Sequence, residues 1–168
     1  MKLAHYFPIF IIAIIFSCTK PPDYPIEPVI EFQRLSRNFM DQGITNNDSV
    51  VVTVSFTDGD GDLGHTDGTI DIFVKDTRVP NADPSPYKMP FVPVQGVGNG
   101  ISGEISILTY STCCLYPPGT FPPCDESEDA TNAYPIDSLI YEIYIMDRAG
   151  NESNHVLSDP VLLQCRVN

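Results

Sequence analysis

The stretch VVVTVSF, residues 50–56, is the segment that decides the fold of this chain. Every second side chain from Val50 to Phe56 is large and apolar, and the side chains between them are valine, threonine and serine. Such alternation places one face of an extended backbone against a core and the other toward solvent. The turn signal Asn46-Asn47-Asp48 stands just before it. We therefore expect a half-buried β-strand over residues 50–56.

Similar alternation recurs on both sides of this segment. The 16 prolines and 11 glycines, and the lack of a sustained 3.6-residue apolar period, favour strands and turns throughout. The further expected strands cover residues 29–34, 69–75, 87–94, 101–110, 138–146 and 155–166, with 87–94 confined to a sheet edge by its prolines. In two of them the side chains expected in phase on the core face are Ile70, Ile72 and Val74, and Leu139, Tyr141, Ile143 and Ile145. About seven short strands separated by turns predict an all-β fold, an antiparallel β-sandwich.

The segment Asp147-Arg148-Ala149-Gly150-Asn151 is a turn signal between the last two expected strands. Asp and Asn side chains accept hydrogen bonds from nearby backbone, and Gly supplies a positive φ. The segment resembles the turn between the last two strands of many bacterial immunoglobulin-like domains, in which D-x-A-G-N recurs. The resemblance implies an immunoglobulin-like strand order for this sandwich. The long segment 111–134 departs from the compact immunoglobulin-like pattern.

The segment TDGDGDLGHTDG, residues 57–68, carries the clearest candidate chemistry. Asp58, Asp60 and Asp62 stand at alternate positions, with glycines between them that let the backbone curl. Calcium binds about six to eight oxygen ligands, so clustered carboxylates on a tight loop suit it. The loop is not an EF-hand, because Leu63 and Thr69 occupy the positions of the required Gly and Glu. The alternative is an acidic turn whose carboxylates are solvated.

The string DGDGDLG resembles a loop common in small lipoproteins of Bacteroidota-type outer membranes, often with immunoglobulin-like domains. This resemblance implies a compartment and a fold, and no reaction. In an immunoglobulin-like sandwich, the loop after the second strand and the loop between the last two strands emerge at the same end. We therefore expect Asp147 and Asn151 to join the three loop aspartates around one structural Ca²⁺.

The N-terminal segment has the pattern of a signal peptide. Lys2 precedes an apolar run over residues 7–16, which is too short to span a bilayer. The following Ile15-Phe16-Ser17-Cys18 resembles a bacterial lipobox, in which the cysteine is lipidated and becomes the first residue of the mature chain. We expect a signal peptide over residues 1–17, a lipidated Cys18 with a flexible, proline-rich tether to residue 27, and one domain over 28–168. The expected location is the outer membrane, on either its periplasmic or its surface face.

Four further cysteines, Cys113, Cys114, Cys124 and Cys165, agree with export to an oxidising compartment. A bond between the adjacent Cys113 and Cys114 would be strained, which leaves two pairings. We favour Cys113–Cys124 with Cys114–Cys165 over the reverse, so that the sandwich carries a disulfide-stapled loop. A zinc site is the alternative, although adjacent cysteines without a histidine pair would be an odd ligand set.

Charge and motifs narrow the function. A formal net charge of −13 argues against binding to nucleic acid. No nucleophile elbow, zinc-binding histidine pair or phosphate loop is present in the sequence, so we expect no enzyme and no catalytic residues. The expected role is an accessory module that docks onto an envelope protein through Leu115, Tyr116 and Phe121 of the stapled loop. Alternatively, these three side chains pack on their own sandwich.

The alternative function is a carbohydrate- or ligand-binding module that serves nutrient uptake. Such sites use exposed aromatic side chains, and Tyr24, Tyr87, Tyr110 and Tyr134 are available for this role. The chain has no tryptophan, which counts against stacking on sugar rings. His65 and His155 are too isolated in the sequence to indicate a catalytic set.

Overall fold

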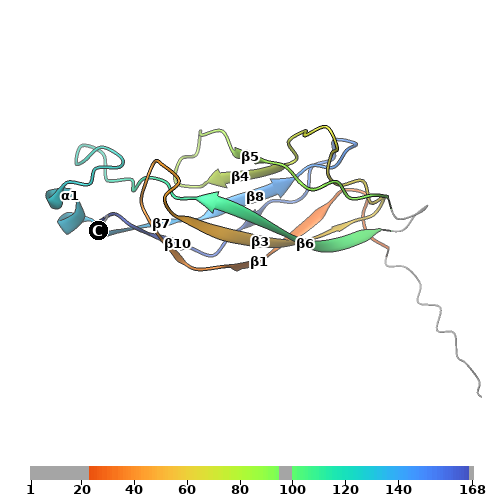
Figure 1. The fold of residues 1–168 in the computed structure, drawn as a ribbon, viewed down its shortest axis with the longest axis horizontal. Coiled ribbons are helices and arrows are strands. Elements are labelled where there is room, and N and C mark those ends of the chain that lie inside the picture. The colour runs from red at the N-terminus through yellow and green to blue at the C-terminus, as the bar shows by residue number, and fades with distance from the viewer. Residues whose placement is uncertain (1–22, 95–99, 167–168) are drawn as a thin grey trace, which may run out of the picture.

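The computed structural model describes residues 23–94 and 100–166. Its strands are β1 (Val29–Leu35), β2 (Phe39–Asp41), β3 (Ser49–Asp58), β4 (Ile72–Asp76), β5 (Ser85–Tyr87), β6 (Ile101–Tyr110), β7 (Ile136–Leu139), β8 (Tyr141–Ile145), β9 (Val156–Leu157) and β10 (Val161–Gln164), and its described helix is α1 (Glu128–Ala133). The strands form two layers that face each other, with β1, β3 and β6 in one and β4, β5 and β8 in the other (Figure 1).

The first layer is the antiparallel sheet β1-β3-β6. Its central strand, β3, contains the segment from which the sequence analysis started. Val50, Val52 and Val54 are buried as expected, while Phe56 is half-buried against the core. β3 pairs with β6 over ten residues, from Ser49 opposite Tyr110 to Asp58 opposite Ile101. This pairing runs the length of the sandwich and sets the register of the first layer.

The second layer contains two sheets, one of four strands in the order β5-β4-β8-β9 and one of three strands in the order β2-β10-β7. The expected strand 138–146 is divided at Ile140 into β7 and β8, and the expected strand 155–166 is divided into β9 and β10. The order of the principal strands is that of an immunoglobulin-like sandwich. The expected all-β, immunoglobulin-like sandwich with a disulfide-stapled loop is confirmed, with one addition: β2 pairs with β10 in parallel.

Several local predictions were wrong. β4 begins at Ile72, and Ile70 is exposed. Of the expected edge strand over 87–94 only Tyr87 lies in a strand, at the end of β5, because prolines at 90 and 93 lack the N–H that continued pairing requires. Strands and turns were expected throughout, so helix α1 was missed. Its six residues are too few to show a helical period of apolar side chains. It begins after Ser127, whose hydroxyl accepts a hydrogen bond from the backbone N of Ala130 at 3.2 Å.

The core lies between the two layers. The four expected core side chains of β7 and β8, namely Leu139, Tyr141, Ile143 and Ile145, are all buried. Residues far apart in the chain complete this core, because Met40 from β2 and Leu163 from β10 belong to the same cluster. Hydrophobic burial across the layers therefore holds the loops at both ends of the sandwich in place.

Replacing Ile143 by alanine should lower the free energy of unfolding by about 2 to 5 kcal/mol, because it removes a fully buried side chain and leaves a cavity. Urea titration followed by circular dichroism measures the change. Leu157→Ala is the matched control, because Leu157 is 59% exposed, and it should change stability by no more than about 0.5 kcal/mol. Equal losses from the two variants would contradict the assignment of the core.

Candidate metal centre

β3 and β8 both end at the end of the sandwich opposite α1 (Figure 1), and three carboxylates meet there. Asp58 is the last residue of β3, Asp62 follows it in the next loop, and Asp147 follows β8. One ligand atom from each of the three lies within 4.8 Å of the others. β3 and β8 belong to different layers, so the two-loop cluster arises where strands of both layers end. This is the juxtaposition that the immunoglobulin-like resemblance implied.

The cluster is buried and only partly satisfied by hydrogen bonds. Asp58 is 0% exposed and Asp147 is 3% exposed. One oxygen of Asp58, Oδ2, accepts a hydrogen bond from the backbone N of Asp62 at 2.9 Å. Oδ1 of Asp58 and Oδ1 of Asp62 are buried without a hydrogen-bond partner among the described residues. Buried carboxylate oxygens rarely stay unpaired, so these two atoms are the ones that a cation would bind.

Asn151 holds Asp147 in position. The backbone N of Asn151 donates to Oδ1 of Asp147 at 2.7 Å, and its Nδ2 donates to Oδ2 at 2.7 Å. The turn between them contains Gly150 at a φ of 90°, a left-handed conformation that favours glycine. Asn151 thus directs its amide nitrogen to Asp147 and supports that carboxylate, while its expected role as a ligand through Oδ1 stays a prediction.

Asp60 stands apart from the three carboxylates. Its side chain is exposed, and it is not a member of the cluster. Gly61, with a φ of 70°, turns the chain between Asp60 and Asp62 and breaks the alternation on which the expectation relied. The spacing of the aspartates in the sequence therefore predicted Asp58 and Asp62 as neighbours, and it placed Asp60 too close to them.

Arg148 joins the two loops, a role that the sequence analysis missed. Its Nη1 donates to the carbonyl oxygens of Leu63 at 2.8 Å, Gly64 at 2.9 Å and Val92 at 3.2 Å. Its guanidinium also lies 5.0 Å from the ring centroid of Phe91. The signal available in the sequence was a lone basic residue inside an otherwise acidic turn.

The electrostatics of the cluster favour a cation. Burial raises the pKa of Asp58 to about 6, and the charges of Asp60, Asp62 and Asp147 add to this effect. Burial and the charges of Asp147 and Asp60 also raise the pKa of Asp62, while Arg148 opposes the rise. At an effective dielectric constant of about 20, two charges 4 to 5 Å apart repel by about 3 to 4 kcal/mol. A divalent cation would convert this repulsion into attraction.

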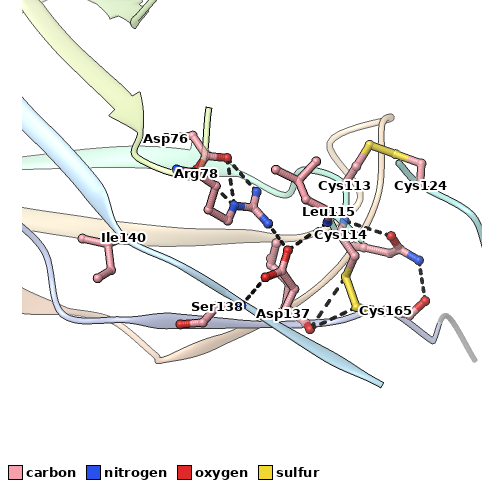
Figure 2. Close-up of polar contacts among 12 residues, drawn as sticks. Asp76, Arg78, Cys113, Cys114, Leu115, Cys124, Asp137, Ser138, Ile140 and Cys165 are labelled. Atoms are coloured by element: carbon pink, nitrogen blue, oxygen red, sulfur yellow. Dashed lines mark hydrogen bonds and ion pairs between the residues drawn. A yellow bond between two sulfur atoms is a disulfide. The ribbon is translucent and has the colours of Figure 1, made fainter. Parts of the chain in front are cut away.

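The opposite end of the sandwich is fixed by disulfides. Cys113 is bonded to Cys124, and Cys114 is bonded to Cys165, which is the pairing that the sequence analysis favoured (Figure 2). The Cα atoms of the two pairs lie 4.6 Å and 5.7 Å apart. All four cysteines are therefore joined in pairs, and the zinc alternative is not supported.

A buried polar network anchors the same loop to the second layer (Figure 2). Asp137 accepts hydrogen bonds from the backbone N of Leu115 at 2.9 Å and from Nη1 of Arg78 at 2.5 Å. Arg78 also pairs with Asp76 at 2.6 Å. The amide of Gln42 accepts from the backbone N of Cys114 at 3.1 Å. Covalent and polar contacts together hold this end of the domain.

The expected partner-binding residues pack largely on their own loop. The ring centroids of Tyr116 and Phe121 lie 5.8 Å apart, and Tyr134 contacts both rings, at 5.9 Å and 6.2 Å. The hydroxyl of Tyr116 donates to the backbone O of Asp125 at 2.8 Å. Leu115, Tyr116 and Phe121 are each half-buried, so only part of each side chain remains available to a partner.

The search against protein-family models, the search of curated proteins and the search of solved structures each found no match. The fold and the site therefore define the class: a disulfide-bonded, immunoglobulin-like β-sandwich with an acidic cluster that could hold a metal ion. Over residues 23–94 and 100–166, no helix has the length and apolar character needed to cross a membrane. Cys18 and the expected signal peptide lie outside the described residues.

In the presence of a chelator, the protein should lose stability as the pH rises from about 4 to about 6. Asp58 has a pKa of about 6 in the folded chain and an ordinary value of 3.8, so the folded state binds more protons in this interval. The expected contribution is about 1 to 3 kcal/mol, measured as the difference in urea unfolding between the wild type and Asp58→Asn. A difference that does not change with pH would contradict a buried, ionised Asp58.

Proposed function

We propose that this protein is a lipid-anchored, non-enzymatic interaction module of the bacterial cell envelope, with a structural calcium ion at the end nearest its anchor. The observation that carries the proposal is the buried cluster of Asp58, Asp62 and Asp147 with its unpaired oxygens. The metal is proposed to be Ca²⁺ because every ligand atom in the cluster is a carboxylate oxygen. Ca²⁺ also tolerates irregular geometry better than Mg²⁺, which requires a near-ideal octahedron.

The position of the cluster supports a structural role for the ion. It joins the end of β3 in one layer to the turn after β8 in the other, so a bound cation would fasten the two layers together. Both Asp58 and Asp147 are almost completely buried, which leaves little access for a substrate. The same cation would offset the burial of the Asp58 carboxylate, which is the main reason for its raised pKa, and the repulsion from the neighbouring carboxylates.

The tether supports the proposed orientation on the membrane. A Cβ atom added to Gly59 would lie 2.5 Å from the backbone O of Tyr24 and 2.6 Å from the backbone O of Pro25. Tyr24 and Pro25 of the expected tether therefore lie against the acidic loop. An anchor attached there would hold the metal end close to the membrane and direct the disulfide-stapled loop away from it, toward a partner protein.

Calcium titration of the soluble chain, residues 19–168, tests the metal site. At 100 times its dissociation constant, Ca²⁺ should raise the free energy of unfolding by about 2.7 kcal/mol, measured by calorimetry and thermal melting. Asp58→Asn should abolish both binding and stabilisation. Asp60→Asn removes an equal charge from an exposed position and should leave both effects nearly unchanged.

Two results would count against the calcium site: equal melting temperatures in Ca²⁺ and in chelator, or a loss of binding in Asp60→Asn that spares Asp58→Asn. Stronger binding of Mg²⁺ than of Ca²⁺ would overturn the choice of metal while leaving the cluster as a cation site.

Removing the lipid-bearing thiol tests the anchor and the docking role. Cys18→Ala should prevent incorporation of labelled fatty acid, because it removes the thiol that would carry the lipid. It should also move the protein from the membrane fraction to the soluble fraction, because stable attachment takes at least two acyl chains. Cross-linking of intact membranes should recover an envelope protein together with the wild type. A wild-type chain that remains in the soluble fraction would contradict the anchor, and recovery of the anchored protein alone would contradict docking.

A further inference from the structure

A cleft of about 310 Å³ opens between the two layers, at the end of the sandwich away from the metal cluster. It lies between β6, which forms one edge of the first layer, and β5, which forms one edge of the second. Tyr87 from β5, Tyr110 from β6 and Tyr141 from β8 all line it. Two of these are tyrosines that the sequence analysis considered for ligand binding. Tyr134 instead packs in the stapled loop, and Tyr24 lies beside the acidic loop.

Tyr141 gives this cleft a specific polar feature. Its side chain is 6% exposed, and its hydroxyl is buried without a hydrogen-bond partner among the described residues. The neighbouring Thr109 directs its own hydroxyl to the backbone O of Val50 at 3.0 Å. Burial raises the pKa of Tyr141, so the hydroxyl is neutral and retains its proton. A buried tyrosine hydroxyl normally has a partner, and Tyr141 is among the residues that line the cleft.

The other lining residues define the chemistry of that partner. Ser85 and Ser111 add hydroxyl groups, and the rings of Tyr87 and Tyr110 add flat apolar surface. The only carboxylate among the lining residues, that of Asp76, is already engaged by Arg78 through hydrogen bonds of 2.6 to 3.2 Å. The cleft therefore offers hydroxyls and aromatic faces and no free charge, and the net charge of −13 disfavours an anionic ligand.

We propose that this cleft binds a neutral saccharide of one or two rings, with an apolar sugar face on Tyr110 or Tyr87 and a sugar hydroxyl bonded to the hydroxyl of Tyr141. The volume lies at the lower end of the range for small-molecule sites, which sets the size of the ligand. The site is independent of the calcium cluster, because Tyr110 and Asp58 lie at opposite ends of the β3–β6 pairing. Failure of either proposal leaves the other standing.

The test uses the full chain in a detergent without a sugar headgroup, with maltose, cellobiose and N,N′-diacetylchitobiose as probes. Saturation-transfer nuclear magnetic resonance should show binding of at least one probe at concentrations up to about 10 mM, both with Ca²⁺ and with a chelator. For that probe, Tyr141→Phe should weaken affinity about tenfold, because it removes one hydrogen bond to a buried group. Tyr110→Ala should weaken it by a similar factor through lost stacking.

Tyr144→Phe is the matched control, because Tyr144 is on β8 but lies outside the cleft, stacked between Phe73 and His155. It should bind the probe like the wild type. Tyr141→Phe keeps the buried ring, so its melting temperature should equal or exceed that of the wild type, which separates lost binding from lost folding. Absence of binding by all three probes, or equal affinity of Tyr141→Phe and the wild type, would overturn the proposal.

Discussion

The ten-residue pairing of β3 with β6 runs from Ser49 opposite Tyr110 to Asp58 opposite Ile101. Both candidate sites depend on it, because it fixes the distance and the orientation between the two ends of the first layer. At one end it delivers Asp58 to the loop after β8. At the other end it places Tyr110 at the cleft between the two layers, which Tyr87 and Tyr141 also line. A slip of one residue in this register would turn the side chains of the slipped strand to the opposite face of the sheet.

The two ends are stabilised by different means. The end near α1 has two disulfides and the Asp76–Arg78–Asp137 network, in which each charged side chain has an oppositely charged partner (Figure 2). The other end brings three acidic groups together and sets a single guanidinium, that of Arg148, to bind carbonyl oxygens beside them. The first arrangement suits an oxidising compartment. The second suits a compartment in which a divalent cation is plentiful.

The sequence predicted those features that local chemistry controls. Alternation located β3, β6 and the long strand that contains β8. The strain of a bond between adjacent cysteines left two pairings, of which the favoured one is observed. Tertiary features escaped prediction. The three residues of β2 pair in parallel with β10, and no local pattern signals such a partner. Asp60 left the cluster because of one backbone turn at Gly61, and Tyr141 was recognised as a core residue without its unpaired hydroxyl.

Charge distinguishes what each end of the domain can bind. At the metal end the unpaired atoms belong to carboxylates that repel one another, so only a positively charged partner lowers their energy. In the cleft the unpaired atom is a neutral hydroxyl, and the nearby carboxylate is already held by Arg78, so a neutral partner is favoured. Because Tyr24 and Pro25 lie against Gly59, the cation would also fix this part of the expected tether. With the proposed lipid on Cys18, the cleft at the opposite end would face away from the membrane.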